Sequence, residues 1–130
     1  MNNIMSELIL RELVFDKIEF IRKGFKNNNK LQLNLQVQIG INEKNGYKVT
    51  LILNGEKEKE YTLNIILTGY FDVENKEGVD NKGEQDLINK NAVAILMPYL
   101  RSEVTLLTSQ PGIDSIVLPP FNVNRMLSKE

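Results

Sequence analysis

The segment between residues 31 and 41 most constrains the fold, because apolar and polar residues alternate along it without a miss. Its apolar positions are Leu31, Leu33, Leu35, Val37, Ile39 and Ile41, separated by Gln32, Asn34, Gln36, Gln38 and Gly40. Successive side chains of a β-strand point to opposite faces of a sheet, so this period of two predicts a long strand buried on one face. The polar face carries amides instead of charges, which is compatible with a partner that covers it.

Two further strand patterns follow along the chain. Asn45-Gly46, a dipeptide that tolerates the positive φ angles of hairpin turns, precedes an alternating segment at 47–54. Asn54-Gly55 and the charged run 56–60 precede a third alternating segment at 61–72. We expect Asn54-Gly55 to open a turn and the charged run to be a solvated hairpin tip. Three consecutive strands joined by tight turns predict an antiparallel meander.

A fourth strand is predicted upstream, at residues 8–21. Leu13 and Phe15 break its alternation, which indicates a bulge or a strand with both faces partly covered. A loop at 22–30 joins it to the next strand. This loop is rich in asparagine and contains a basic cluster, for which a solvated loop is a better interpretation than a phosphate site. The cluster consists of Arg22, Lys23, Lys26 and Lys30.

The period changes to that of a helix between residues 84 and 109, where there is no glycine. Apolar residues recur there at steps of three and four: Ile88, Ala92, Ile95, Leu96, Tyr99, Leu100, Val104 and Leu107. We expect Pro98 to kink or split this helix and Pro111-Gly112 to end it. An extended return at 113–121 then leads to Asn122, which is suited to cap a short terminal helix reaching residue 129.

This order of elements predicts one domain over residues 1–130 of the α+β class. The predicted architecture is a four-stranded antiparallel sheet with a long Pro-interrupted helix and a short C-terminal helix on one face.

The composition narrows the chemistry, because the chain contains neither histidine nor cysteine. Serine–histidine triads, cysteine nucleophiles and most zinc sites need one of the two. Catalysis by carboxylate, lysine or tyrosine, or a Mg²⁺ or Ca²⁺ site with oxygen ligands, remains open. Our expectation is nevertheless that the protein has no cofactor, no metal site and no catalytic residue. The net charge of −1 gives no field that would attract nucleic acid. No apolar run approaches the roughly 20 residues that span a bilayer, and no signal peptide is evident, so a cytoplasmic protein is expected.

Three short motifs resemble the protein-export chaperone SecB family. Met97-Pro98-Tyr99-Leu100-Arg101 resembles the Phe-Pro-Tyr-Ala-Arg-Glu signature of the main helix of that family, although Glu103 is displaced by one residue. Leu118-Pro119-Pro120-Phe121-Asn122 is similar to its Leu-Ala-Pro-Val-Asn stretch, and Gly69-Tyr70-Phe71 to its Gly-Ile-Phe segment. The order of elements agrees over residues 8–127.

The resemblance implies an ATP-independent holdase for protein export and translocation, assembled as a homotetramer that is a dimer of dimers. Its partners would be unfolded precursor proteins, held in grooves between the sheet, the long polar loop expected at residues 72–83 and the helix. The candidates for lining this client groove are Leu33, Leu35, Tyr70, Phe71, Met97 and Tyr99. Ordinary core packing or a subunit interface is the alternative for each of them.

One departure from the family concerns SecA, the translocase motor, which the family engages through acidic residues on the outer face of the sheet. The positions that correspond here are Lys17, Ile21, Thr62 and Asn64. None is acidic, although Asp16 and Glu19 are close by, and this argues against SecA docking. A SecB-like chaperone of a toxin–antitoxin pair, or a module for one specific partner, is a second hypothesis. A small enzyme that uses carboxylates such as Glu103 or Asp114 is a third.

Overall fold

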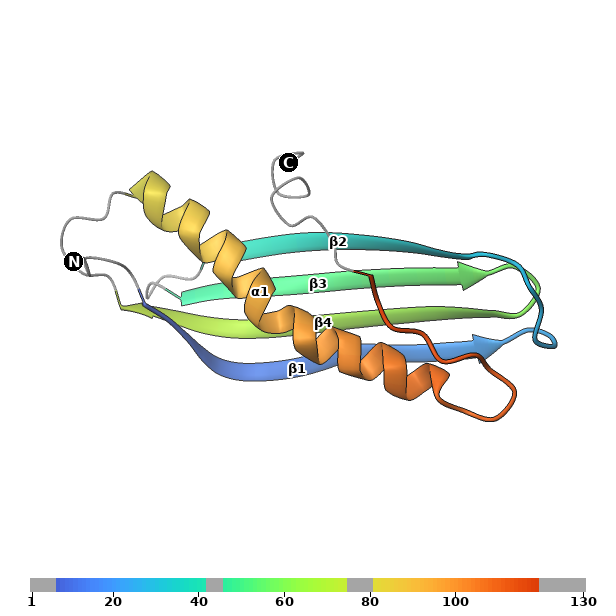
Figure 1. The fold of residues 1–130 in the computed structure, drawn as a ribbon. Helices are drawn as coiled ribbons and strands as arrows, with labels where there is room; N and C mark the ends of the chain where they lie inside the picture. Colours follow the sequence, from blue (N-terminus) through green and yellow to red (C-terminus); the bar gives the residue numbers. More distant parts are fainter. Residues whose placement is uncertain (1–6, 42–45, 75–80, 120–130) are drawn as a thin grey trace.

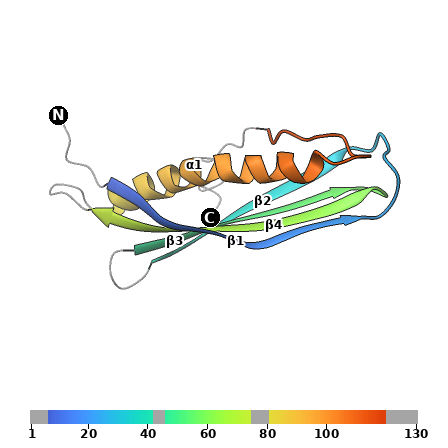
Figure 2. The same ribbon diagram turned by 90° about the horizontal axis from the view of Figure 1, so that it is seen from below.

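The computed structural model describes residues 7–41, 46–74 and 81–119. It contains the strands β1 (Glu7–Arg22), β2 (Leu31–Ile41), β3 (Gly46–Lys57) and β4 (Tyr61–Glu74) and the helix α1 (Asn81–Thr108). The strands form one antiparallel sheet in the order β1-β4-β3-β2, and α1 lies obliquely across one of its faces (Figures 1 and 2). We call this the inner face and the opposite one the outer face. The antiparallel α+β architecture is confirmed.

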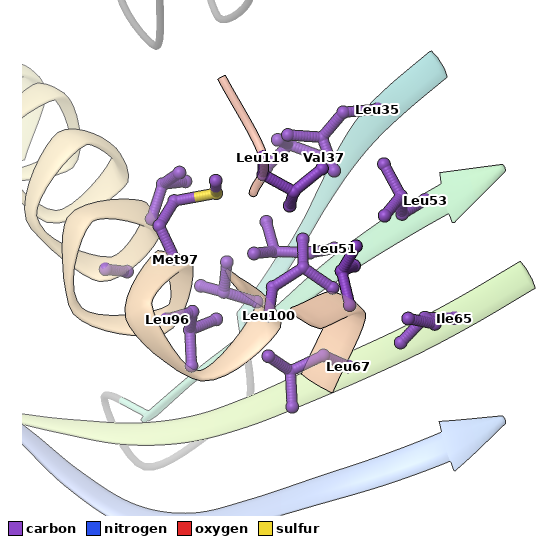
Figure 3. Packing of buried hydrophobic residues seen from close by; sticks show 14 of the residues in the cluster. Leu35, Val37, Leu51, Leu53, Ile65, Leu67, Leu96, Met97, Leu100 and Leu118 are labelled. Atoms are coloured by element: carbon purple, nitrogen blue, oxygen red, sulfur yellow. The ribbon is translucent and has the colours of Figure 1, made fainter. Parts of the chain in front are cut away.

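The hydrophobic core lies between the inner face and α1. Leu51 and Leu53 of β3, with Ile65 and Leu67 of β4, are fully buried there and face the helix (Figure 3). From the helix come Val93, Leu96, Met97, Leu100 and Val104, and Leu118 closes the core beside β2. Burying one such side chain contributes about 1.5–3 kcal/mol, so this layer holds the helix on the sheet.

Helix and sheet lie in close contact at Gly69. A Cβ atom added there would lie 2.7 Å from Leu96 Cδ2 and 2.9 Å from Phe71 Cε2. No real Cβ contact is this short, so only glycine leaves room for the Leu96 side chain.

The edge strand β1 carries the irregularity that its sequence predicts. Its pairing with β4 shifts register between Leu10 and Glu12 and again between Phe15 and Lys17. Because of these shifts, Leu13 and Phe15 share the inner face, whereas Val14 lies opposite Thr68 on the outer face. The expected bulge is confirmed.

The turn expected at Asn54-Gly55 is wrong, because both residues belong to β3. Gly55 lies on the inner face, where an added Cβ would be 3.0 Å from Leu33 Cδ2 and 3.2 Å from Leu63 Cγ. The glycine therefore makes room for two leucines. The actual turn follows Lys57, where Glu60 N donates to Lys57 O and Lys59 takes a positive φ of 64°.

The split expected as one alternative at Pro98 is also wrong, because α1 continues through this residue as one helix. Proline removes the hydrogen bond to the carbonyl four residues earlier, here that of Ala94. Both residues are exposed, so that carbonyl is on the solvent side, while core residues before and after Pro98 hold the helix in place. The short helix predicted from Asn122 lies outside the described residues.

Candidate polypeptide-binding surface

The structure does not gather the six predicted groove residues in one place. Leu35, Phe71 and Met97 are buried in the core, and Leu33 is half-buried beside them on the inner face. The other two, Tyr70 and Tyr99, are exposed on opposite sides of the sheet. Tyr70 lies on the outer face, 36% exposed, and Tyr99 on the helix, 44% exposed.

Several exposed apolar side chains that no sequence pattern had indicated lie on α1, in the segment after it, and in the loop between β1 and β2. Phe25 is 90% exposed between β1 and β2, and Val117 is 75% exposed after the helix. Leu106, 61% exposed on α1, borders a shallow hollow of about 400 Å³ with Arg101, Ser102 and Thr105. No sequence signal distinguishes these residues, because a single apolar residue in a loop or on a helix is not periodic.

The loop that joins β1 to β2, residues 23–30, is fastened to the turn between β3 and β4. We call it the crossover loop. Lys23 N and Gly24 N donate to Glu60 O at 2.7 and 3.1 Å. The side-chain amides of Asn27 and Asn29 donate to Glu58 O at 2.9 and 2.8 Å. The asparagine-rich stretch, interpreted from sequence as solvated, is therefore attached to the turn.

Glu60 has no exposed surface and Lys57 is 8% exposed, so the expectation of a solvated tip is wrong for these two residues, whereas Glu56, Glu58 and Lys59 are exposed. Its Oε1 lies 2.8 Å from Lys57 Nζ and accepts the backbone N–H of Asn27 at 3.0 Å. Burial raises the pKa of this carboxyl, but the hydrogen bonds from Lys57 and Asn27 and the charges of Lys57 and Arg22 lower it by more. Its pKa therefore lies below the ordinary value.

Tyr61 lies beside Glu60 and stacks on Phe20, with ring centroids 4.7 Å apart. Burial, followed by the nearby charges of Glu60 and Asp114, raises the pKa of its hydroxyl. Glu60 Oε2 and this hydroxyl are both buried and have no hydrogen-bond partner among the described residues.

Residues 109–119, the return segment, run back from the end of α1 across the inner side of the sheet (Figure 1). Thr108 is buried, donates to Val104 O and accepts Ile116 N–H at 2.8 Å, while Thr105 donates to Ile116 O. The two hydroxyls thus bond both the N–H and the C=O of Ile116 in the return segment. They fix the return segment against α1.

An ion pair joins the return segment to the crossover loop. Lys26 Nζ lies 2.7 Å from Asp114 Oδ1, and both side chains are more than half exposed. The hydrogen bond and charge of Asp114 raise the pKa of Lys26, and the hydrogen bond from Lys26 lowers the pKa of Asp114. Asp114, a candidate of the enzyme hypothesis, is engaged in this pair. Glu103 is half-buried on α1.

The outer face carries several amides and hydroxyls. Asn34, Asn54 and Asn64 lie in one row across β2, β3 and β4, which ends on β1 at Glu19. Asn64 Nδ2 donates to Glu19 Oε1 at 2.8 Å, and Thr68 donates to Asp16. The two acidic residues nearest the SecA-type positions are thus both hydrogen-bonded within the sheet.

The positions compared with the SecA-binding residues of the family gather on this outer face. Ile21 lies opposite Thr62, Asn64 opposite Glu19, and Lys17 opposite Ile66. The structure brings the four positions together, but none of them supplies a negative charge.

Neither a metal cluster nor a membrane-spanning helix is found in the described ranges. No three or more acidic, histidine or cysteine side chains gather there as a metal site requires. Within the same ranges, no helix is long and apolar enough to cross a bilayer.

Comparison with known proteins gives a family and a fold. Residues 4–130 match the family model described as preprotein translocase subunit SecB. The uncharacterized protein MJ0357 of Methanocaldococcus jannaschii is 25% identical over 128 residues, covering 95% of this chain and 81% of the relative.

Two solved structures share the fold. The SecB-like chaperone Rv1957 of Mycobacterium tuberculosis, in complex with a ChAD peptide from the Rv1956 HigA1 antitoxin, superposes with a TM-score of 0.71 at 14% identity, covering 88% of each chain. A protein of unknown function from Streptococcus agalactiae superposes with a TM-score of 0.52 at 10% identity, covering 88% of this chain and 98% of that one.

Proposed function

The chain belongs to the preprotein translocase subunit SecB family, and we propose that it is an ATP-independent cytoplasmic holdase that binds extended segments of unfolded polypeptides. The observation that carries this proposal is the set of large apolar side chains left exposed around the helix side of the sheet. Phe25, Tyr99 and Val117 belong to it. An apolar surface of this kind binds non-native chains without a catalytic group.

The edges of the sheet support the same function. β1 and β2 are the outer strands of the sheet, so each has one side with no neighbouring strand among the described elements. An extended polypeptide can add to such an edge by main-chain hydrogen bonds, whatever its sequence. Leu33 on β2 and Tyr99 on α1 are the predicted groove residues best placed to add apolar contacts there. The buried Leu35, Phe71 and Met97 would support the groove from below.

We further propose that the protein assembles as a homotetramer, a dimer of dimers, in which part of the exposed helix face packs against another copy. Leu106 and its hollow suit such an interface, because apolar surface is enriched where subunits meet.

Two measurements test this function. Light scattering should give the mass of a tetramer, and the protein should suppress aggregation of an unfolded client without nucleotide. Phe25→Ser should weaken this suppression, whereas Tyr70→Ser, on the outer face, should leave it unchanged. A monomer that leaves client aggregation unaltered would contradict the proposal.

A second candidate is a chaperone dedicated to one partner, such as an antitoxin, and not coupled to SecA. The four positions compared with the SecA-binding residues favour it, because Lys17, Ile21, Thr62 and Asn64 lack the acidic groups expected for SecA docking. Binding to purified SecA, measured by calorimetry, distinguishes the two. Tight binding that is lost in high salt would support an export chaperone, and no binding would support a dedicated one.

A further inference from the structure

The turn between β3 and β4 contains a buried glutamate, Glu60, at a position where the fold itself does not require a charged residue. Glu60 is fully buried and Lys57 is 8% exposed, with 2.8 Å between their charged groups. Taking two ions out of water costs several kcal/mol, so a buried pair contributes little net stability. In some proteins such a pair instead selects one arrangement of the groups around it.

The groups around Glu60 belong to the crossover loop. Its carboxylate accepts the N–H of Asn27, and its backbone carbonyl accepts those of Lys23 and Gly24. The loop lies directly on the turn, since a Cβ added at Gly24 would be only 2.3 Å from Lys59 O. Glu60 therefore holds the loop at both ends of the stretch 23–27.

The same stretch is held from the other side by the return segment. Lys26 is paired with Asp114, and Gly112 lies over the guanidinium of Arg22, where an added Cβ would be 3.2 Å from a terminal nitrogen. The return segment is itself hydrogen-bonded to α1. The loop is thus fixed both to the end of the sheet and to the end of the helix.

Phe25 is the residue that this arrangement displays. Its neighbours Gly24 and Lys26 are each held by a contact, whereas the Phe25 ring is 90% exposed. An apolar side chain presented on a fixed backbone loses less conformational entropy when it binds than one on a mobile loop. The contacts that fix the crossover loop therefore favour binding through Phe25, whereas the packing of the core does not require them.

We propose that Glu60 is a positioning residue of the client-binding site, which fixes the crossover loop so that Phe25 is presented to an extended, apolar polypeptide segment. The part of this inference that concerns the client rests on the proposed holdase function. The part that concerns the contacts of the crossover loop does not depend on it. Glu60 acts through Phe25 and does not touch the client.

The experiment combines Glu60→Gln with Phe25→Ala in a double-mutant cycle. Glu60→Gln retains the shape of the side chain but removes its charge. Amide exchange over residues 23–30, measured by mass spectrometry, should rise by on the order of tenfold, as expected when a charge-assisted hydrogen bond is weakened. Affinity for a labelled apolar peptide derived from an unfolded client should fall by a similar factor. In the Phe25→Ala background, Glu60→Gln should cause no further loss of affinity.

Two variants control for unspecific unfolding. Asn29→Ala removes one exposed side-chain bond to the turn, and should raise loop exchange by a smaller factor with the rest of the chain unchanged. Glu58→Gln changes a neighbouring, exposed carboxylate, and should alter neither exchange nor affinity. If Glu60→Gln prevents folding, the double-mutant cycle is carried out with Asn29→Ala in its place, combined with Phe25→Ala.

Three results would overturn the inference: unchanged loop exchange in Glu60→Gln, losses of affinity that add in the double variant, or a wild-type chain that does not bind the peptide. Only the last would also contradict the proposed function. In that case the exchange data still decide whether Glu60 fastens the loop.

Discussion

The two faces of the sheet are built from the same strands but are stabilised in different ways. On the inner face, which α1 crosses, residues such as Leu51, Leu53 and Leu67 are fully buried (Figure 3). On the outer face no described helix packs, yet Thr68 is also fully buried, with its hydroxyl bonded to Asp16 and 3.2 Å from that of Thr50. The inner face is held by apolar area and the outer face by a few hydrogen bonds.

This difference suggests a division of roles. The helix side contains the core and, at its margins, the exposed apolar residues that we propose for client binding. The outer face mixes amides and hydroxyls with charged residues such as Lys17 and Lys48, and no described helix covers it.

The largest expected contrast is between two adjacent residues of β4. Leu67→Ala should lower the free energy of unfolding by about 2–5 kcal/mol, because it leaves a cavity between sheet and helix. Ile66→Ala, a half-buried residue on the outer face, should cost about 1 kcal/mol. Urea denaturation measures both. Equal losses would mean that something covers the outer face as completely as α1 covers the inner one.

A second contrast compares two glycines. Gly69→Ala places a Cβ against Leu96 and should destabilise the protein by about 1–3 kcal/mol, as overpacking of a core does. The nearest atom to a Cβ at Gly40, Lys48 O, is 4.0 Å away, so Gly40→Ala should fold normally. Thermal unfolding of the two variants provides the measurement, and a harmless Gly69→Ala would show that helix and sheet are not so closely packed.

The hydrogen bonds of the outer face give a smaller effect. Thr68→Val removes a hydroxyl that bonds Asp16 and approaches Thr50, and should cost about 1 kcal/mol. Thr62→Val, on the same strand and face, removes a hydroxyl for which the described residues provide no side-chain partner, and should be close to neutral. Chemical denaturation of the pair tests this, and identical midpoints would remove the role given to the Asp16–Thr68 bond.

The smallest expected effect concerns the ionisation of Glu60. This residue and Lys57 lie at the end of the inner face, where charged residues replace the apolar ones. The folded pKa of Glu60 is below its ordinary value of 4.5, so its contribution is complete above pH 4.5 and is lost as pH falls through the lowered pKa. Lys57 and Arg22 stabilise the charged form, and the Lys26–Asp114 pair lies nearby. The amide resonance of Asn27 should therefore titrate with a midpoint below 4.5.

Glu60→Gln is the control for that titration, because Asp114 also has a lowered pKa. In this variant, the chemical-shift change of the Asn27 amide resonance with pH should disappear. A midpoint at or above 4.5, or a step that persists without Glu60, would contradict the assignment.

Much of the fold could be predicted, because its signals are local. The period-two pattern of residues 31–41 places Leu35 and Val37 on the buried face, and the structure pairs this strand with β3 in one uninterrupted register. The irregular positions Leu13 and Phe15 correctly indicated a bulge in β1. The candidate site was predicted less well, since Phe25 and Glu60 carry no periodic signal and Tyr70 and Tyr99 are on opposite sides.

The sequence by itself determined the alternating strands, the helix, the absence of histidine and cysteine chemistry, and a resemblance to SecB. Each depends on residues close together in the chain or on composition. Only the tertiary structure decided that Gly55 makes room for Leu33 and Leu63, that α1 continues through Pro98, and that Glu60 is buried under the crossover loop. These outcomes depend on contacts between residues far apart in sequence, which override the local preference for a turn, a helix break or a solvated charge.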